Sequence, residues 1–255
     1  MTVLRAEVAE NLSWVWTFDQ AEFKARCEWG LSGLKQLAPI SDVVLIINVS
    51  SVSTALDIAA ARGASVFPYP LSESAQAYAE SLRATLASSD RGFGYSLSPA
   101  SLRSLPPGSR LVLPSCNGAA LAFSANHPLV LASCLRNASA SGRLATRLGS
   151  TFAVIPAGEA WPDGELRPSL EDWVGAGAVI ASLPGKPSPE ANLAALSFEH
   201  LRANLSDSIR QASSGKELVS RGFSLDVQLA AELDVSRNVP KLKDRAFIGE
   251  LVGEP

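Results

Sequence analysis

The stretch VVLIINVSSVST, residues 43–54, decides the fold class. Its first five residues are apolar and mostly β-branched, which is typical of a strand buried on both faces of a parallel sheet. The polar residues after them are typical of a turn, and Val52, Leu56 and Ala59 then recur at helical spacing. A buried strand followed by a turn and a helix predicts an α/β protein.

The same alternation continues along the chain. We therefore expect a three-layer α/β/α sandwich with a mostly parallel, mixed sheet, and we read residues 1–255 as a single domain. From residue 188 onward the pattern is mostly helical and ends in a polar tail, and a period-2 pattern near Trp14 and Trp16 predicts an edge strand. Further strands are predicted at 64–67, 109–113, 129–132 and 151–155, and further helices at 72–87, 117–125, 137–148 and 169–183, with a short helix opened by Ser98 and Pro99.

The composition excludes several classes of protein. The chain is 47% hydrophobic and 18% charged with a net charge of −3, so nothing draws it electrostatically to nucleic acid or to an anionic membrane. Its longest apolar run has five residues, against the ~20 that a membrane helix needs. With three cysteines and no apolar leader segment, the sequence predicts a cytoplasmic protein.

Several familiar catalytic motifs are missing from the sequence. There are two histidines and no HExxH, no CxxC, no GxxxxGK[ST] loop, no GxSxG elbow and no Asp-x-Asp pair. No arginine follows any of the three cysteines at the sixth position. Oxygen-bearing side chains must therefore carry most of any chemistry.

Three polar segments follow predicted strands and precede predicted helices: 48–54, 114–118 and 136–137. Ligands of open α/β sheets bind at the carboxyl ends of strands, and helix N-termini offer N–H groups to anions. The alternatives are helix capping by Ser and Thr, a tight turn at Asn117-Gly118, and a solvated Arg136 beside a capping Asn137. Cys116 has no neighbouring base in the sequence to activate it.

A fourth segment carries carboxylates. Glu171 and Asp172 open a predicted helix, and Glu159 precedes them. Two adjacent carboxylates are suited to Mg²⁺, although acids in a first turn also interact favourably with the helix dipole. Gly175 and Gly177 in the same helix indicate close approach of another backbone or of a ligand, because glycine destabilises a helix by ~1 kcal/mol relative to alanine.

Taken in order, these segments resemble the 2-phosphosulfolactate phosphatase family, also called ComB. The likeness runs from about Trp29 to about Pro240. Its carriers are the segments 43–54, 62–64, 96–99, 113–118, 135–138 and 157–159, together with Glu171-Asp172 and Gly175-Ala176-Gly177.

The resemblance implies an α/β/α fold and Mg²⁺-dependent hydrolysis of a phosphomonoester. The substrate named for the family is 2-phospho-3-sulfolactate, and the reaction is associated with coenzyme M synthesis. In the family the turn after the first buried strand usually reads Asp-Val-Leu-Arg-Ala-Ser/Thr-Thr. Here Asn48 stands in place of the Asp and Ser51 in place of the Arg. A neutral amide is a poorer metal ligand than a carboxylate, and it is no general base.

We therefore expect a phosphoric monoester hydrolase that takes a small-molecule phosphomonoester and uses Mg²⁺ held by Glu171 and Asp172. No nucleic acid or membrane is expected as a partner, and a homodimer is left open. The alternatives are a ComB-like anion-binding protein without turnover, favoured by Asn48 and Ser51, and, more remotely, an enzyme that uses Cys116. The residues predicted at the catalytic site are Asn48, Ser53, Thr54, Ser98, Asn117 and Arg136.

Overall fold

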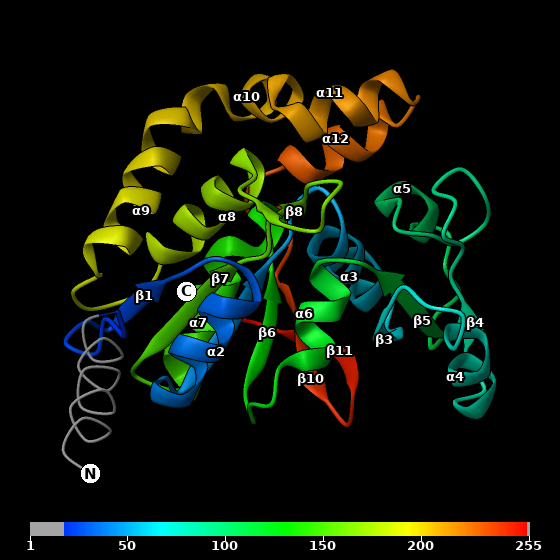
Figure 1. The fold of residues 1–255 in the computed structure, drawn as a ribbon, viewed down its shortest axis with the longest axis horizontal. Coiled ribbons are helices and arrows are strands. Elements are labelled where there is room, and N and C mark those ends of the chain that lie inside the picture. The colour runs from blue at the N-terminus through cyan, green and yellow to red at the C-terminus, as the bar shows by residue number, and fades with distance from the viewer. Residues whose placement is uncertain (1–17, 254–255) are drawn as a thin grey trace, which may run out of the picture.

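The computed structural model describes residues 18–253, and within this range nine strands form one mixed sheet (Figure 1). The strands of that sheet are β1 (Ala25–Cys27), β2 (Val43–Ile47), β3 (Ser65–Pro70), β4 (Thr85–Leu86), β5 (Arg110–Ser115), β6 (Val130–Ser133), β7 (Phe152–Pro156), β10 (Asn238–Lys243) and β11 (Ala246–Leu251). A separate hairpin pairs β8 (Glu159–Ala160) with β9 (Leu166–Arg167).

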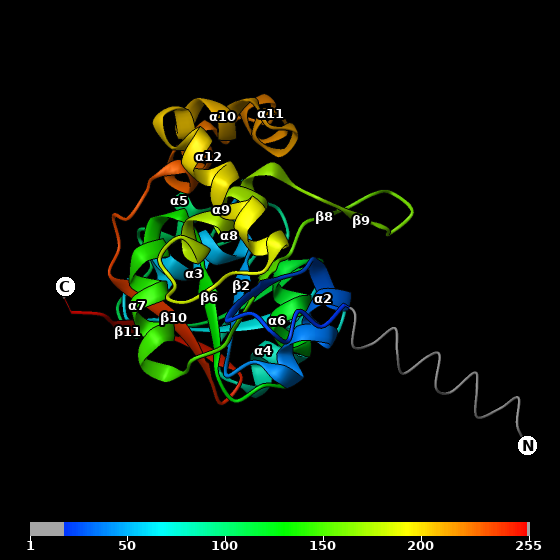
Figure 2. The same cartoon turned by 90° about the vertical axis from the view of Figure 1, so that its left-hand side faces the viewer.

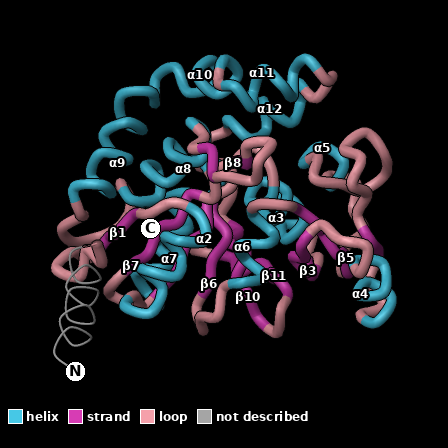
Figure 3. Tube along the Cα trace, in the orientation of Figure 1, coloured by secondary structure: helices cyan, strands magenta, loops and turns pink. Residues whose placement is uncertain are grey.

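Helices flank the sheet and also lie over one end of its strands (Figure 3). The α-helices are α2 (Gly30–Leu37), α3 (Val52–Ala61), α4 (Ala75–Ser81), α5 (Pro99–Leu102), α6 (Gly118–Ser124), α7 (Ala138–Leu148), α8 (Leu170–Ile180), α9 (Pro189–Leu201), α10 (Leu205–Gln211), α11 (Ser213–Ser220) and α12 (Ser224–Ala231). Short 3₁₀ helices are η1 (Ala38–Ile40), η2 (Leu135–Asn137) and η3 (Arg202–Asn204).

The large sheet consists of two parallel groups joined by an antiparallel hairpin. Its strand order is β1-β7-β2-β6-β10-β11-β3-β5-β4. Strands β1, β7, β2 and β6 pair in parallel, and so do β3, β5 and β4. Strands β10 and β11 pair antiparallel with each other and with their outer neighbours β6 and β3. The prediction of a mostly parallel, mixed sheet is therefore confirmed.

Strand β2, which begins the stretch 43–54, lies inside the first parallel group, between β7 and β6. All five residues of β2 are buried, and they alternate between two hydrophobic cores. Val43, Leu45 and Ile47 pack into the core shared with α7, α8 and α9, whereas Val44 and Ile46 pack into the core shared with α2, α3 and α6. A strand that feeds two cores must have helices on both faces, so the three-layer prediction is confirmed.

One predicted helix is longer than the helix in the structure. The helix expected over 72–87 ends at Ser81, and β4 follows it. Arg83 takes a φ of +50° just past the helix, at a position that usually holds glycine, so this helix end has no signal in the residue pattern. The edge strand expected near Trp14 and Trp16 lies outside the described residues.

The expected polar tail is wrong, because its residues form the β10–β11 hairpin inside the sheet. The turn between the two strands has Asp244 and Arg245 at φ values of +50° and +65°. Two-residue hairpin turns of this kind usually carry Asn-Gly or Asp-Gly. Pro240 also made β10 hard to predict, since proline is rare in paired strands.

The two glycines of α8 are explained by packing. A Cβ atom on Gly175 would lie 2.5 Å from Val49 Cγ2, at the end of β2, and one on Gly177 would clash with the carbonyl oxygen of Ala194 in α9. Of the two alternatives left by the sequence, close approach to neighbouring protein atoms therefore accounts for both glycines. The two glycines therefore allow α8 to lie close to the end of β2 and to α9.

The helices of the last third of the chain lie over one end of the sheet. Helices α10, α11 and α12 form a group at the top of Figure 1, and Figure 2 shows the β8–β9 hairpin projecting from the body beside them. Helix α12 packs against α5 and η2, so this group is tied to the loops that leave the strands.

Candidate active site

A polar cavity of about 220 Å³ lies beneath α11 and is lined by residues that follow β2, β5 and β7. Its lining combines hydroxyl, amide, carboxylate and guanidinium groups. Polar side chains that gather at strand ends and face a concave surface are typical of ligand sites in α/β proteins. The hydrogen-bonding and charged side chains of this lining include those of Ser50, Ser51, Arg91, Asn117, Glu159 and Arg221.

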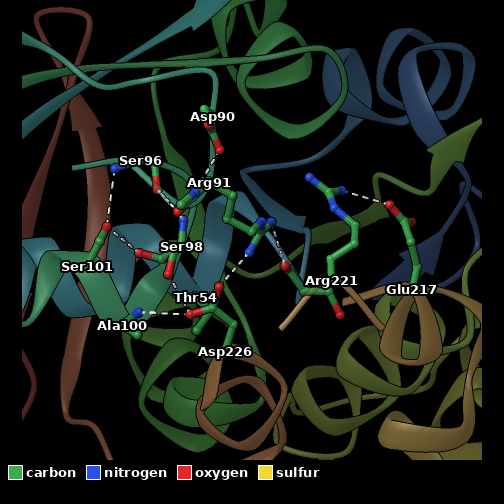
Figure 4. Close-up of polar contacts among 12 residues, drawn as sticks. Thr54, Asp90, Arg91, Ser96, Ser98, Ala100, Ser101, Glu217, Arg221 and Asp226 are labelled. Carbon is green, nitrogen blue, oxygen red and sulfur yellow. Dashed lines mark hydrogen bonds and ion pairs between the residues drawn. The ribbon is translucent and has the colours of Figure 1, made fainter. Parts of the chain in front are cut away.

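Arg91 is fixed by contacts on two sides (Figure 4). Its Nη1 donates to Asp226 Oδ2 at 3.0 Å, and its Nη2 donates to the carbonyl oxygen of Ser50 at 3.3 Å. Its side chain is 11% exposed and that of Asp226 is 2% exposed. The pair therefore holds a guanidinium in a fixed position at the wall of the cavity, as bidentate anion binding requires.

A second arginine lies near the same aromatic ring as Arg91. Arg221 Nη1 donates to Glu217 Oε1 at 2.9 Å, and Figure 4 shows this pair beside Arg91. The guanidinium carbons of Arg91 and Arg221 lie 5.9 Å and 5.6 Å from the ring centre of Phe223. Cation–π contacts of this kind help to orient both arginines.

Asp172 joins the ends of two neighbouring strands. Its Oδ1 accepts from the Val49 backbone N–H at 2.6 Å, and its Oδ2 accepts from the Gly158 N–H at 2.9 Å and from Asn48 Nδ2 at 3.2 Å. These donors follow β2 and β7, where the ladder of the sheet ends. A buried carboxylate there satisfies donors that would otherwise be unpaired.

The electrostatics around Asp172 favour a cation. Burial raises the pKa of Asp172 well above its usual value, and Glu171 adds to the rise, while the donors of Val49 and Asn48 oppose it. Burial also raises the pKa of Glu159, again with a contribution from Glu171, although Arg167 opposes this rise. Glu171 thus lies close enough to both Asp172 and Glu159 to disfavour the ionised forms of these two carboxyl groups.

Glu171 supplies the most direct indication of a missing partner. Its side chain is 2% exposed, and its Oε1 accepts no hydrogen bond. Residues 18–253 contain no group of three or more His, Cys, Asp or Glu side chains arranged around one metal position. Mg²⁺ is commonly held by only one or two carboxylates together with phosphate oxygens and water, so Glu171 with Glu159 fits such an ion.

The structure brings two of the predicted catalytic residues to adjoining positions. Asn117 lines the cavity, and its Nδ2 donates to Glu159 Oε2 at 3.1 Å. Asn48 is buried and lies against Gly118, the residue after Asn117. A Cβ atom on Gly118 would lie only 2.6 Å from Asn48 Oδ1. Both amide atoms of Asn48 are engaged, since Oδ1 accepts from the Val52 N–H and Nδ2 donates to Asp172.

The hydroxyls of Ser53 and Thr54 point into the protein. Ser53 Oγ accepts from the Asn48 N–H at 2.9 Å and donates to the Ile46 carbonyl oxygen, and Thr54 Oγ1 donates to the Val49 carbonyl oxygen at 2.6 Å. Both residues thus shape the turn after β2. Their predicted contact with a ligand stays a prediction.

Two further predicted residues bind buried carboxylates outside the cavity lining. Ser98 Oγ donates to Asp226 Oδ1 at 2.7 Å, next to the Arg91 pair. Arg136 donates from Nε to Asp57 Oδ2 at 2.8 Å and from Nη1 to Glu232, on the side of the molecule formed by α3 and the end of α12. Arg136 is therefore not brought together with Asn117.

Sequence reasoning missed both arginines of the cavity, whereas Ser50 belongs to the predicted polar segment 48–54 but not to the residues chosen for the catalytic site. Arg91 stands before Gly92 in a loop-rich segment, where an arginine between turn residues indicates a ligand-binding loop only weakly. Ser50 Oγ is buried at the cavity wall and has no hydrogen-bond partner. Arg221 stands in a helical segment far along the chain, and only the tertiary structure brings it to the strand ends.

The fold and the cavity place the protein in the class of α/β proteins that have a polar cavity where the strands of a mostly parallel sheet end. Within that class, a family model described as 2-phosphosulpholactate phosphatase matches residues 33–245. The chain therefore belongs to the 2-phosphosulfolactate phosphatase family, as its sequence motifs predicted.

Two curated relatives are similar to this chain. A protein of Carboxydothermus hydrogenoformans named probable 2-phosphosulfolactate phosphatase is 29% identical over 209 residues, which cover 78% of this chain and 85% of the relative. A protein of Gloeobacter violaceus with the same name is 31% identical over 136 residues, 52% of this chain and 56% of the relative.

Among the described residues, no helix is both long and apolar enough to span a membrane.

Proposed function

We propose that this protein hydrolyses the phosphomonoester of a small hydroxy acid in a Mg²⁺-dependent reaction, with 2-phosphosulfolactate as the first candidate substrate. Family membership and the names of the relatives support the reaction class. The observation that carries the proposal is the unpartnered Oε1 of buried Glu171 beside Glu159 and Asp172, next to a cavity lined by two arginines.

Glu171 and Glu159 are the carboxylates that would hold Mg²⁺. Glu171 has an oxygen without a partner, and Glu159 lines the cavity. Asp172 was the ligand expected from the sequence, but its oxygens already accept three N–H bonds, which leaves little capacity for a metal. Asp172 instead acts as a positioning residue that holds the ends of β2 and β7 together.

The remaining lining groups bind and orient the substrate. Arg91 and Arg221 present guanidinium groups to the acid groups of the substrate, and the free hydroxyl of Ser50 offers a donor beside them. Asn117 keeps Glu159 oriented through the 3.1 Å hydrogen bond. Bound Mg²⁺ would neutralise charge on the phosphoryl group and make a water molecule more acidic. Positioning and charge neutralisation supply most of the rate in such reactions.

The experiment is a phosphate-release assay on a panel of phosphomonoesters that includes 2-phosphosulfolactate, with Mg²⁺ and with EDTA. We expect release that depends on Mg²⁺. The variants Glu171→Gln and Glu159→Gln are expected to lose at least ~10²-fold in kcat/KM, in the range typical for loss of a catalytic electrostatic group. Glu199→Gln, an exposed position on α9, is the matched control and is expected to retain activity.

Mg²⁺ binding provides a second readout that is independent of turnover. Titration calorimetry is expected to show binding to the parent protein and to the Glu199→Gln variant, with clearly weaker binding to Glu171→Gln. Unchanged Mg²⁺ affinity and unchanged activity in Glu171→Gln would refute the metal assignment.

The environment of Asn48 supports one alternative, an anion-binding protein without turnover. Asn48 is neutral, and both of its amide atoms are engaged in structural hydrogen bonds where the family motif has an acid. If no phosphomonoester is hydrolysed and Asn48→Asp restores phosphate release, this alternative replaces the active enzyme.

A further inference from the structure

A second cavity of about 200 Å³ adjoins the polar one. Its walls come from the first turn of α2, the outer side of α6, the residue after β7 and the β8–β9 hairpin. Cys116, Asn117 and Glu159 line both cavities, so the two spaces meet at these residues. A molecule bound in the polar cavity can therefore extend into the second one.

The second cavity is mainly apolar. Its lining includes Leu31, Ala120, Leu121, Ala157 and Leu166, and Ser124 is a polar lining residue away from the junction with the first cavity. Leu31 is 45% exposed and Leu166 is 41% exposed. Apolar side chains that line a concave surface in contact with water gain stability when a ligand covers them.

The position of Leu166 is set by the backbone around it. A Cβ atom on Gly158 would lie 2.7 Å from Leu166 Cδ1, and one on Gly30 would lie 3.4 Å from the same atom. The side chain of Leu166 is thus seated between α2 and the strand end that carries Glu159. The apolar wall is consequently built by tertiary packing and is not a chance feature of an exposed loop.

The charges of the two cavities differ. The polar cavity has Arg91 and Arg221, whereas Glu159 alone is charged among the described residues that line the second cavity. A sulfonate or a second phosphate in the part of the second cavity beyond Glu159 would meet no arginine or lysine among these described lining residues. Desolvating an anion there against leucine and alanine side chains is unfavourable.

The space is large enough for several carbon atoms, since an apolar cavity of about 150 Å³ binds benzene. From this cavity we infer that the organic part of the substrate carries an uncharged alkyl or aryl group, which occupies the apolar cavity while its phosphate and carboxylate occupy the polar one. Leu31, Ala160 and Leu166 then determine specificity. This inference rests on the proposed phosphatase function and, because of the lining of the second cavity, ranks 2-phosphooxy carboxylic acids with an apolar side chain ahead of 2-phosphosulfolactate as substrates.

The test is a homologous series of probes: 2-phosphooxy-propanoate, -butanoate, -pentanoate and -hexanoate, with 2-phosphosulfolactate for comparison. Both kcat/KM with Mg²⁺ and the dissociation constant by titration calorimetry are measured. We expect kcat/KM to rise about threefold to fourfold per added methylene until the cavity is filled. The dissociation constant is expected to fall by the same factor per methylene.

Two variants with matched controls locate the effect. Ala160→Leu places a larger side chain at an exposed position of the second cavity and is expected to abolish the gain with chain length, and Ala77→Leu at an exposed position of α4 is its control. Leu31→Gln removes apolar surface from the wall, with the exposed Leu193→Gln of α9 as its control. Both controls are expected to retain the chain-length dependence of the parent protein.

The outcomes separate this inference from the proposed function. Phosphate release that stays flat or falls along the series, with 2-phosphosulfolactate as the best substrate, overturns the inference and leaves the phosphatase function standing. Tighter binding along the series without any phosphate release supports the cavity assignment and overturns the phosphatase function. A series with neither turnover nor chain-length dependence in binding overturns both.

Discussion

Two buried aspartates hold together segments around the cavity, and they differ in how their charge is balanced. Asp172 and Asp226 are 1% and 2% exposed, and each accepts three hydrogen bonds. The donors to Asp226 include the guanidinium of Arg91, whereas the donors to Asp172 are all neutral. Burial and Glu171 therefore raise the pKa of Asp172.

The difference shows which side of the site calls for a cation. Around Asp226 the protein supplies its own positive charge, so this carboxylate serves as a structural tie between α12, α5 and the loop of Arg91. Around Asp172 the neighbouring acids Glu171 and Glu159 repel one another, and an oxygen of Glu171 lacks a partner. A bound divalent ion would balance this second group and leave the first unaffected.

The largest effect is expected from Asp226→Ala. Removal of one partner leaves the charge of Arg91 buried and without a counter-charge. We therefore expect the free energy of unfolding to fall by about 3–5 kcal/mol. Urea denaturation measures the loss, and Asp226→Asn separates the charge from the hydrogen bonds and is expected to lose less. A decrease in the unfolding free energy of less than about 1 kcal/mol in Asp226→Ala would mean that the ion pair does not hold α12, α5 and the loop of Arg91 together.

Mg²⁺ is expected to stabilise the parent protein against urea by about 2.7 kcal/mol at a concentration near 100 times its dissociation constant. The same gain is expected in Asp226→Ala, because this aspartate belongs to the balanced group. It is expected to be absent in Glu171→Gln. Equal stabilisation in Glu171→Gln and in the parent protein would remove the contrast between the two groups.

A smaller effect is expected from Asp172. It is measured as the pH dependence of the unfolding free energy, with EDTA present so that no Mg²⁺ is bound. The folded pKa of Asp172 is raised above the unfolded value of 3.8, so the folded state binds more protons between the two values. Its contribution to stability is therefore fully present below pH ~4 and declines as the pH rises through the folded pKa. The unfolding free energy of the parent protein minus that of Asp172→Asn is expected to fall from pH 4 to pH 7 in urea titrations. A difference that rises with pH would contradict the sign of the shift.

The smallest effect concerns Asp42, which also accepts three hydrogen bonds but lies exposed at the surface. Donors from Ser150 and Thr151 lower its pKa to about 2. Because the folded pKa is depressed, its contribution is present above the unfolded value and is lost as the pH falls through about 2. Asp42→Ala is expected to destabilise by no more than about 1 kcal/mol at pH 7, since solvent screens an exposed group.

Thermal unfolding at pH 7 and at pH 2 measures this last difference. We expect the melting temperatures of the parent protein and Asp42→Ala to converge at the lower pH. The pair Asp42 and Asp172 then shows that three donors lower a carboxyl pKa at the surface and fail to do so in the interior, where desolvation is larger.

Much of the architecture could be predicted from local pattern. The apolar run of β2 and the helical spacing after it follow directly from residues that are neighbours in the chain, so the three-layer fold and the positions of most strands were predictable. The ends of α4 and the β10–β11 hairpin were not, because Arg83, Asp244 and Arg245 adopt positive φ values that glycine usually takes. Only the surrounding structure holds these residues in that conformation.

The sequence by itself determined the fold class, the family and the segments that follow the strands, because periodicity and turn chemistry act over a few residues. Tertiary structure decided which polar groups face the cavity. Asn117 and Glu159 meet there from distant segments, Arg91 and Arg221 join them, and Arg136 pairs with Asp57 instead. Hydrogen-bond partners and burial depend on residues far apart in the chain, and they set both the direction of each pKa shift and the charge that a ligand must bring.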